Sequence, residues 1–331
     1  MLLNCNIYQL LRNTERVEVC RVNTLRQFCT DTRNMEFCAK FRPITNMHDR
    51  TKGLLITLIG VLFVVPDSIM VRLISSDPMV TAFWRSLTSG TIVAVFVLLS
   101  MRQQAWQTLT KMGPSGWLYC VLIGTTSPSF VLAVQNTSVA NVVLIFASMP
   151  VFSAILSFVL LGETPSRPLI FTGCFVFCGL GVIGYGSGGG GESNWIGDLW
   201  AIYIVIAFAL ALTLLRRQKH VSMLPAIPIG YIGSACIMFW FINPTDTLHV
   251  DAPLYIVHGV LIAVSTCGLT LGPRYISSTE VSLLILLESV FAPILAWVML
   301  AEIPSVMTVL GGVLILAALA LYNILSFMRS T

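Results

Sequence analysis

The chain has 331 residues, of which 56% are hydrophobic and only 10% are charged, and its formal net charge is +4. Soluble domains carry about 25% charged residues because their surfaces face water. So few charges exclude an ordinary soluble domain, and the composition predicts a membrane protein.

The first 52 residues account for the net charge, because they hold nine of the 19 Lys and Arg and five of the 15 Asp and Glu. They contain no apolar core long enough for a secretory signal. We therefore expect residues 1–52 to form a poorly ordered basic tail in the cytoplasm. In an alternative interpretation, the native chain starts at Met47.

From residue 53 onward, apolar segments follow one another with short polar or Gly/Pro-rich breaks between them. An α-helix needs about 20 apolar residues to cross a bilayer. We therefore predict an all-α polytopic membrane protein with ten transmembrane helices. Their expected spans are residues 53–73, 79–100, 116–135, 139–161, 168–186, 197–215, 223–242, 254–274, 279–301 and 305–327.

Basic residues between these spans predict the orientation, because cytoplasmic loops are enriched in Lys and Arg. If the helices alternate in direction, Lys111, the run "RRQKH" at 216–220 and Arg274 share one side with the tail. We expect both termini in the cytoplasm and the protein in the inner or plasma membrane of the cell.

The chain also repeats itself. Residues 136–166 align without a gap on 275–305, with twelve identities in 31 positions and a shared E-x-P-S ending. The predicted organisation is a five-helix repeat over 53–186, a Gly-rich linker over 187–196, a second repeat over 197–327 and a short tail over 328–331. Because five is odd, the second copy enters the membrane inverted, an arrangement typical of secondary transporters.

Three segments carry a resemblance to a known family: "AFWRSL" at 82–87, "NTSVANVVLIFASMPVFSAILSFVLLGE" at 136–163 and "RYISSTEVSLLILLESVFAPILAWVMLAE" at 274–302. The sequence resembles EamA-type carriers of the drug/metabolite transporter superfamily. The resemblance implies ten helices in two inverted repeats, and it does not indicate the substrate. The acid-proline pair of the family's ninth helix reads Glu288-Ser289 here.

Two ionisable residues stand out in the first two spans. Asp67 follows Pro66, which can kink a helix, and Arg85 lies six positions into the second span at a similar predicted depth. Ionisable groups within a bilayer often mark a transport pathway. Asp67 and Arg85 could bind a zwitterionic substrate between them, or they could form a permanent ion pair that locks two helices.

Glu288 lies near the middle of the ninth span and is the candidate coupling residue. Burial disfavours the charged form of a carboxyl group, which suits reversible protonation during transport. The alternative role for Glu288 is a hydrogen bond to a neighbouring helix.

Four further residues are candidates for substrate binding. Trp84 and Trp297 could stack on a planar molecule, and Asn136 and Asn141 could hydrogen-bond a substrate. Such residues also serve as interfacial anchors and as contacts between helices.

These features predict a secondary transporter, an exporter or an exchanger, that moves small organic metabolites or drugs across a membrane by alternating access. Proton coupling is the expected option for driving it. The expected partners are the substrate and the lipid bilayer, with a homodimer as an option; no nucleic acid, cofactor or metal is predicted. One alternative is a membrane-embedded enzyme acting on lipid-linked substrates, for which His249, His258, Asp246 and Asp251 are the candidate residues. Another is a carrier-derived receptor or scaffold that no longer transports.

Overall fold

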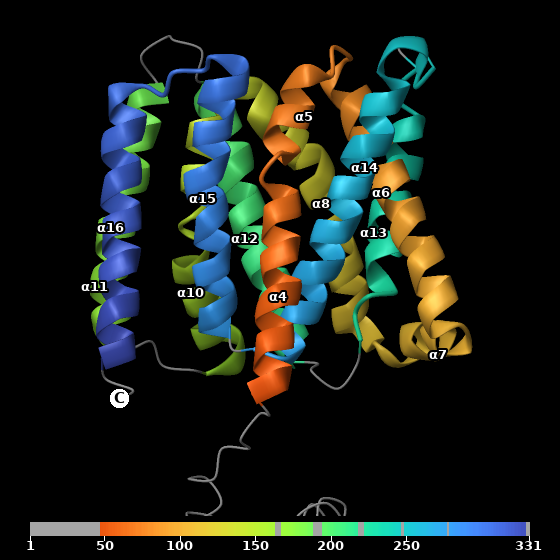
Figure 1. Ribbon diagram of the computed structural model, residues 1–331, viewed down its shortest axis with the longest axis horizontal. Coiled ribbons are helices and arrows are strands. Elements are labelled where there is room, and N and C mark those ends of the chain that lie inside the picture. The colour runs from red at the N-terminus through yellow and green to blue at the C-terminus, as the bar shows by residue number, and fades with distance from the viewer. Residues whose placement is uncertain are drawn as a thin grey trace, which may run out of the picture. The chain divides into compact units, whose positions relative to one another are not determined.

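The computed structural model describes residues 47–162, 167–187, 194–217, 222–245, 248–276 and 278–328. Within these residues every regular element is a helix, and the long helices run side by side as one bundle (Figure 1). The predicted tail up to residue 46, most of the predicted linker and residues 329–331 lie outside the described residues. The elements are α4 (Met47–Val64), α5 (Asp67–Leu73), α6 (Pro78–Met101), α7 (Gln103–Lys111), α8 (Gly113–Asn136), α9 (Val139–Phe146), α10 (Met149–Leu161), α11 (Arg167–Ser187), α12 (Trp195–Arg217), α13 (Ala226–Phe239), α14 (Leu248–Leu271), the 3₁₀ turn η1 (Gly272–Arg274), α15 (Ser278–Leu300) and α16 (Val306–Met328).

Among the described residues, seven helical segments are long and apolar enough to cross a membrane, and they match seven of the predicted spans. Three shorter apolar helical stretches, Ala226–Phe239, Leu284–Leu300 and Val306–Tyr322, lie at the other three predicted spans. The described residues therefore belong to an all-helical, multi-pass protein, and the count of ten crossings stays a prediction.

Two of the predicted spans are each built from two helices. The first breaks between α4 and α5 at Pro66, which lacks the backbone N–H that would continue the helix. The fourth breaks between α9 and α10 at Ala147 and Ser148, just before Pro150. Broken helices within a bundle are tolerated where neighbouring protein surrounds the freed backbone groups.

The segment between the second and third spans is a helix rather than the simple polar break that the sequence suggested. This helix, α7, follows Arg102, whose backbone turns the chain with a φ of 44°. Its Ala105 is buried while its Trp106 is exposed. The short helix is therefore amphipathic. Nine mostly polar residues are too few for an apolar period to be recognised in the sequence.

The two halves of the chain run in opposite directions through the bundle. We call the end at which α4 begins the tail end and the opposite end the far end. Arg72 of α5 hydrogen-bonds the carbonyl of Thr137 directly after α8, and Asn194 beside α12 hydrogen-bonds the carbonyl of Asn136. The first span thus ends where the sixth begins, as an inverted second half requires.

Helices in equivalent places of the two predicted repeats pack against each other. The pairs are α6 with α13, α9 with α15, and α11 with α16. Figure 1 shows α11 and α16 together at one side of the bundle and α6 with α13 at the other, with α4, α8 and α12 between them. Residues from both halves therefore meet in the middle.

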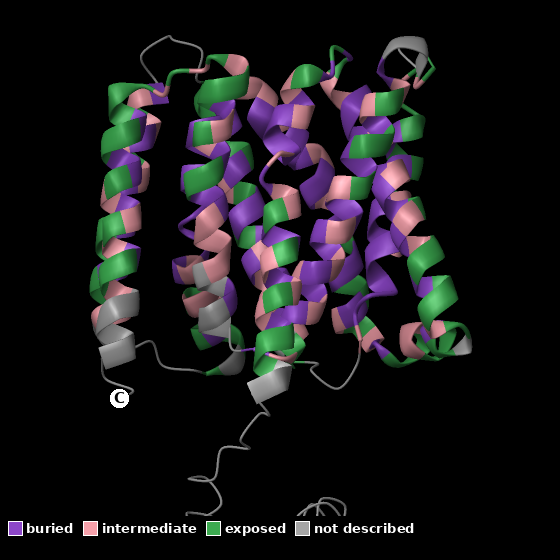
Figure 2. Cartoon of the chain, in the orientation of Figure 1, coloured by how far each residue is buried: buried purple, intermediate pink, exposed green. Residues whose placement is uncertain are grey.

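Burial follows the same plan. Buried residues gather in the central helices, and exposed residues lie on the outward faces (Figure 2). Many of the exposed side chains are large and apolar, among them Leu99, Val159, Phe171 and Val298. An apolar exterior around a packed interior suits a protein surrounded by lipid.

Close approach of α8 and α13 depends on two glycines. A Cβ added at Gly124 would lie 2.6 Å from the carbonyl oxygen of Gly230, and a Cβ added at Gly230 would meet the carbonyl oxygen of Cys120. Small residues let membrane helices approach backbone to backbone. Gly233, three residues along α13, has open space where its Cβ would be.

We therefore predict that Gly230→Ala destabilises the protein by about 1–3 kcal/mol, because overpacking forces the two backbones apart. Gly233→Ala is the matched control and should leave the melting temperature unchanged or slightly raised. Thermal unfolding of both variants in detergent provides the measurement. Equal melting temperatures for the two variants would contradict the close packing of α8 and α13.

Candidate functional site

Asp67 is the first residue after the break in the first span. Because Pro66 interrupts the helix, Asp67 begins α5 in the interior of the bundle, and only 2% of it is exposed. An ionised carboxylate in such a position needs compensation by positive charge and hydrogen bonds. The side chains around Asp67 provide both.

Arg85 of α6 forms a two-pronged ion pair with Asp67. Its Nη2 lies 2.7 Å from Asp67 Oδ2 and its Nε lies 3.1 Å from Oδ1. The remaining Nη1 donates to Ser127 Oγ of α8 at 2.8 Å, and the guanidinium lies over the ring of Phe130. The pair therefore connects α5, α6 and α8 with the paired, parallel hydrogen bonds that stabilise buried Arg–carboxylate contacts.

His258 of α14 is a third member of this cluster. Its Nε2 lies 2.5 Å from Asp67 Oδ1, and the side chain is fully buried. Its Nδ1 has no hydrogen-bond partner among the described residues. His258 brings the second half of the chain into contact with the Asp67–Arg85 pair.

The sequence placed His258 only among the residues of the alternative enzyme site. A lone histidine within an apolar span is a signal of an internal polar contact, but spacing along the chain could not assign its partner. Asp67 lies 191 positions away. Only the packing of α14 against α5 and α6 brings the two together.

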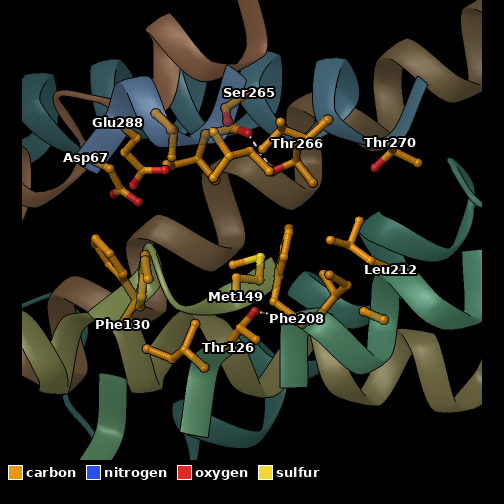
Figure 3. Close-up of a pocket in the computed structure, with 18 of the residues that line it drawn as sticks. Asp67, Thr126, Phe130, Met149, Phe208, Leu212, Ser265, Thr266, Thr270 and Glu288 are labelled. Atoms are coloured by element: carbon orange, nitrogen blue, oxygen red, sulfur yellow. Dashed lines mark hydrogen bonds between the residues drawn. The ribbon is translucent and has the colours of Figure 1, made fainter. Parts of the chain in front are cut away.

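A cavity of about 100 Å³ extends from this cluster through the bundle. Figure 3 shows Asp67 and Glu288 near each other at one end and Thr270 at the other. The wall is mostly apolar, with side chains from both halves of the chain. Its aromatic members are Tyr119, Phe130, Phe146, Phe208 and Tyr231, and its small polar members are Thr126, Ser265, Thr266 and Thr270.

Glu288 of α15 lines the cavity and is 8% exposed. Among the residues that the structure describes, it has neither a hydrogen-bond partner nor a cation within salt-bridge distance. In the alignment of the two repeats, Glu288 corresponds to Met149, which also lines the cavity. One repeat therefore places a carboxyl group where the other places a thioether.

Four of the predicted site residues do not line this cavity: Trp84, Asn136, Trp297 and Asn141. Trp84 stacks on Tyr255 and donates through Nε1 to the carbonyl of Pro244 at 2.9 Å. Asn136 ends α8, and its side-chain amide donates to Leu132 of the same helix. Trp297 is 60% exposed on α15 and belongs to the outer surface of the bundle.

Asn141 is buried in a junction between helices. Its amide nitrogen donates to Thr137 Oγ1, to Ser187 Oγ and to Asp198 Oδ1, while its Oδ1 accepts from Thr308 Oγ1 at 2.6 Å. These partners come from α11, α12, α16 and the turn before α9. In this arrangement Asn141 joins helices, as interhelical polar residues in membranes often do.

A second set of polar contacts closes the far end. Glu302 Oε1 accepts from the backbone N–H of Val139 at 2.7 Å, the first residue of α9, and Arg72 lies beside it. Thr137 donates to Asp198 Oδ1 of α12 at 2.8 Å. These contacts cross between the two halves of the chain at the far end, directly beyond the Asp67 cluster.

Toward the tail end the cavity wall continues. Leu215 lies two residues before the end of α12, and Thr270 lies one residue before the end of α14; both line the cavity. The conformation is therefore closed by polar contacts at the far end and hollow toward the tail end.

The two described residues of the alternative enzyme site, Asp251 and His258, belong to different clusters. Asp251 hydrogen-bonds Ser76 near the far end, whereas His258 contacts Asp67. Asp246 and the side chain of His249 lie outside the described part of the chain. Among the described residues, no group of three His, Cys, Asp or Glu side chains could hold a metal ion.

Comparison with known proteins agrees with this architecture. A family model described as the EamA-like transporter family matches residues 51–185 and again 195–324. The chain belongs to the EamA-like transporter family. The two matches are the two halves whose helices run in opposite directions, and they confirm the resemblance that the sequence carried.

A solved structure described only as the crystal structure of a protein aligns with a TM-score of 0.58 and 16% identity, covering 85% of this chain and 99% of that one. At this identity it shares the fold alone with this EamA-like protein. Among curated proteins, no relative matches this chain.

We predict that Asp67→Asn and Arg85→Gln each destabilise the protein by about 3–5 kcal/mol, because each leaves a buried partner uncompensated. The double variant should lose less than the sum of the two, since neither charge is then left alone. Thermal unfolding in detergent measures the cycle, with Arg102→Gln, at an exposed arginine outside the cluster, as the control. Stable single variants that lose transport would instead support a substrate bound between Asp67 and Arg85.

A comparison of the two asparagines tests the role of Asn141. Asn141→Ala should lower stability by about 1–3 kcal/mol for each buried group left unsatisfied, whereas Asn136→Ala removes one contact within its own helix. The substrate concentration at half-maximal flux should stay the same in both. A rise in that concentration for Asn141→Ala, at unchanged stability, would show that the amide binds substrate.

Proposed function

We propose that this protein is a secondary transporter of small organic metabolites or drugs that works by alternating access across ten membrane spans. The observation that carries the proposal is the internal cavity. It lies between the two halves of an EamA-like chain, contains charged side chains, and is closed by polar contacts at one end. A cavity in an inverted-repeat bundle suits exposure to one side of the membrane and then to the other.

The inverted repeats supply the physical basis for the exchange. Two copies of one unit in opposite orientations can swap conformations, which closes one end as the other opens. The far-end contacts of Glu302 and Arg72 with the start of α9 hold the present state. The Arg72 and Glu302 side chains are partly exposed, so breaking these contacts is compatible with a transport cycle on microsecond to second timescales.

The lining of the cavity supports a small organic substrate. Ligand pockets are mostly apolar with a few polar groups. The wall here has aromatic and aliphatic side chains with a few hydroxyls, and its charged groups are at one end.

We propose that the carrier resides in the inner or plasma membrane of the cell. Both termini then lie in the cytoplasm, because basic residues gather at the tail end.

Glu288 is the proposed proton-coupling site. It faces the cavity, has no protein partner among the described residues, and lies beside Asp67 (Figure 3). A carboxyl group in this position can be reached by a substrate and by protons from the same cavity.

Counterflow in proteoliposomes tests the carrier function. Vesicles loaded with pooled amino acids, nucleosides, organic acids or organic amines are challenged with labelled members of each pool, with and without a pH gradient. We expect labelled substrate to accumulate with one pool and a pH gradient to change the rate. Absence of counterflow for every pool by folded protein would contradict transport of these metabolite classes.

Glu288→Gln should remove the response to the pH gradient from whatever flux remains, because the amide cannot take up a proton. Asp77→Asn, which changes an exposed carboxylate at the start of α6, is the matched control and should respond as the wild type does. A pH response that survives Glu288→Gln would show that the coupling proton binds elsewhere.

A further inference from the structure

The charges in the cavity wall do not balance. Its ionisable acids and bases among the described residues are Asp67, Arg85 and Glu288. Arg85 holds both carboxylate oxygens of Asp67, so these two charges cancel within one pair. Glu288 is left as the one acid in the described wall without a counterion.

Helix α15, which bears Glu288, packs on α5, α9 and η1, and these elements place no cation in the cavity wall beside it. Arg274 of η1 is exposed and does not line the cavity. On α5 the group that faces it is Asp67, which is a like charge, and α9 has no titratable side chain. Arg85 on α6 and His258 on α14 are both bound to Asp67. The other titratable groups of the described wall are the phenols of Tyr119 and Tyr231, which at neutral pH carry no charge.

A carboxylate without a counterion is strongly disfavoured in an apolar interior. Glu288 must therefore hold either a proton or a positively charged guest. A negatively charged guest would meet Glu288 and Asp67 at this end of the cavity, while the guanidinium of Arg85 is already bound to Asp67 and Ser127.

The aromatic wall favours one kind of positive guest. Phe130, Phe146, Phe208, Tyr119 and Tyr231 line the cavity with Glu288. Aromatic faces attract organic cations, including quaternary ammonium groups, and their rings also bury an apolar body. A small metal cation would gain little here, because hard cations prefer several oxygen ligands.

We propose that the substrate class is a monovalent organic cation, an amine or quaternary ammonium with an apolar body, that exchanges for one proton at Glu288. This inference rests on the proposed carrier function. When the cation enters, the carboxylic O–H bond breaks, the proton leaves to water through the cavity, and the carboxylate pairs with the cation. Net charge in the cavity is the same before and after.

The repeat alignment offers an unusually direct variant. Glu288→Met places at this position the residue that the first repeat has at Met149, so it removes the carboxyl group and keeps an apolar wall. Glu288→Gln keeps the shape and hydrogen bonding without the charge. Glu288→Asp keeps the charge, and Asp77→Asn removes an exposed carboxylate away from the cavity.

Calorimetric titration of the full chain in detergent tests the proposal with three probes of similar size: benzyltrimethylammonium, phenylacetamide and phenylacetate. Buffers of different ionisation enthalpy report the protons released. We expect only the cation to bind, with proton release rising toward about one per cation as the pH falls. Each unit by which the pH falls should lower the apparent affinity for the cation by a factor that approaches ten, because the cation and the proton compete for Glu288.

Glu288→Gln and Glu288→Met should weaken cation binding by about 30-fold or more, as expected for loss of one partner of a buried charge pair, and should abolish proton release. Glu288→Asp should retain proton-linked binding, and Asp77→Asn should match the wild type. Thermal unfolding checks that each variant is folded. The proposal is overturned by cation binding that survives Glu288→Met, by binding without proton release, by equal binding of the amide or anion, or by no cation binding to folded wild type.

The two proposals can fail separately. Proton-linked cation binding without counterflow of any pool would overturn the carrier function and leave the cation site. Counterflow of amino acids, nucleosides or organic acids without cation binding would overturn the cation site and leave the carrier function.

Discussion

The structure depends on how one buried acid is compensated. Asp67 lies in the interior of an apolar bundle, where an unpaired carboxylate would be strongly disfavoured. Arg85 and His258 contact it directly with charge and hydrogen bonds, and Ser127 accepts a hydrogen bond from Arg85, so that three further helices take part. Because α14 belongs to the second half of the chain, this cluster also joins the two halves at the middle of the bundle.

The Asp67 cluster leaves one acid of the cavity wall unpaired. Because Arg85 pairs with Asp67, Glu288 has no partner among the described residues. The two-fold relation between the repeats makes the asymmetry plain, since Met149 occupies the matching position. The two similar halves thus have the same helical framework, and only the second half places an acid at this position.

Polar contacts elsewhere serve packing and closure. Asn141 ties together α9, α11, α12 and α16, and Glu302 accepts from the start of α9 at the far end. These groups lie outside the cavity wall and hold helix ends that both repeats contribute. These interior polar residues therefore bind helices together, whereas Glu288 faces the cavity, and Asp67 and Arg85 do both.

Several features followed from the sequence alone. Low charge content and apolar runs of membrane length determined an all-helical membrane protein, and the match of 136–166 with 275–305 determined the duplication. Charged residues within apolar runs pointed to Asp67, Arg85 and Glu288, and all three line the cavity. Burying a charge in lipid or protein is so costly that a charged residue within an apolar run is rare and indicates a paired or functional position.

The tertiary structure decided which partners those residues meet. Trp84, Trp297, Asn136 and Asn141 have the chemistry of binding residues, yet the structure places them at the surface or between helices. His258 has an ordinary position in the sequence and reaches Asp67 only across 191 residues. Hydropathy records how much of a helix is apolar, whereas the direction a side chain faces depends on which helices pack beside it.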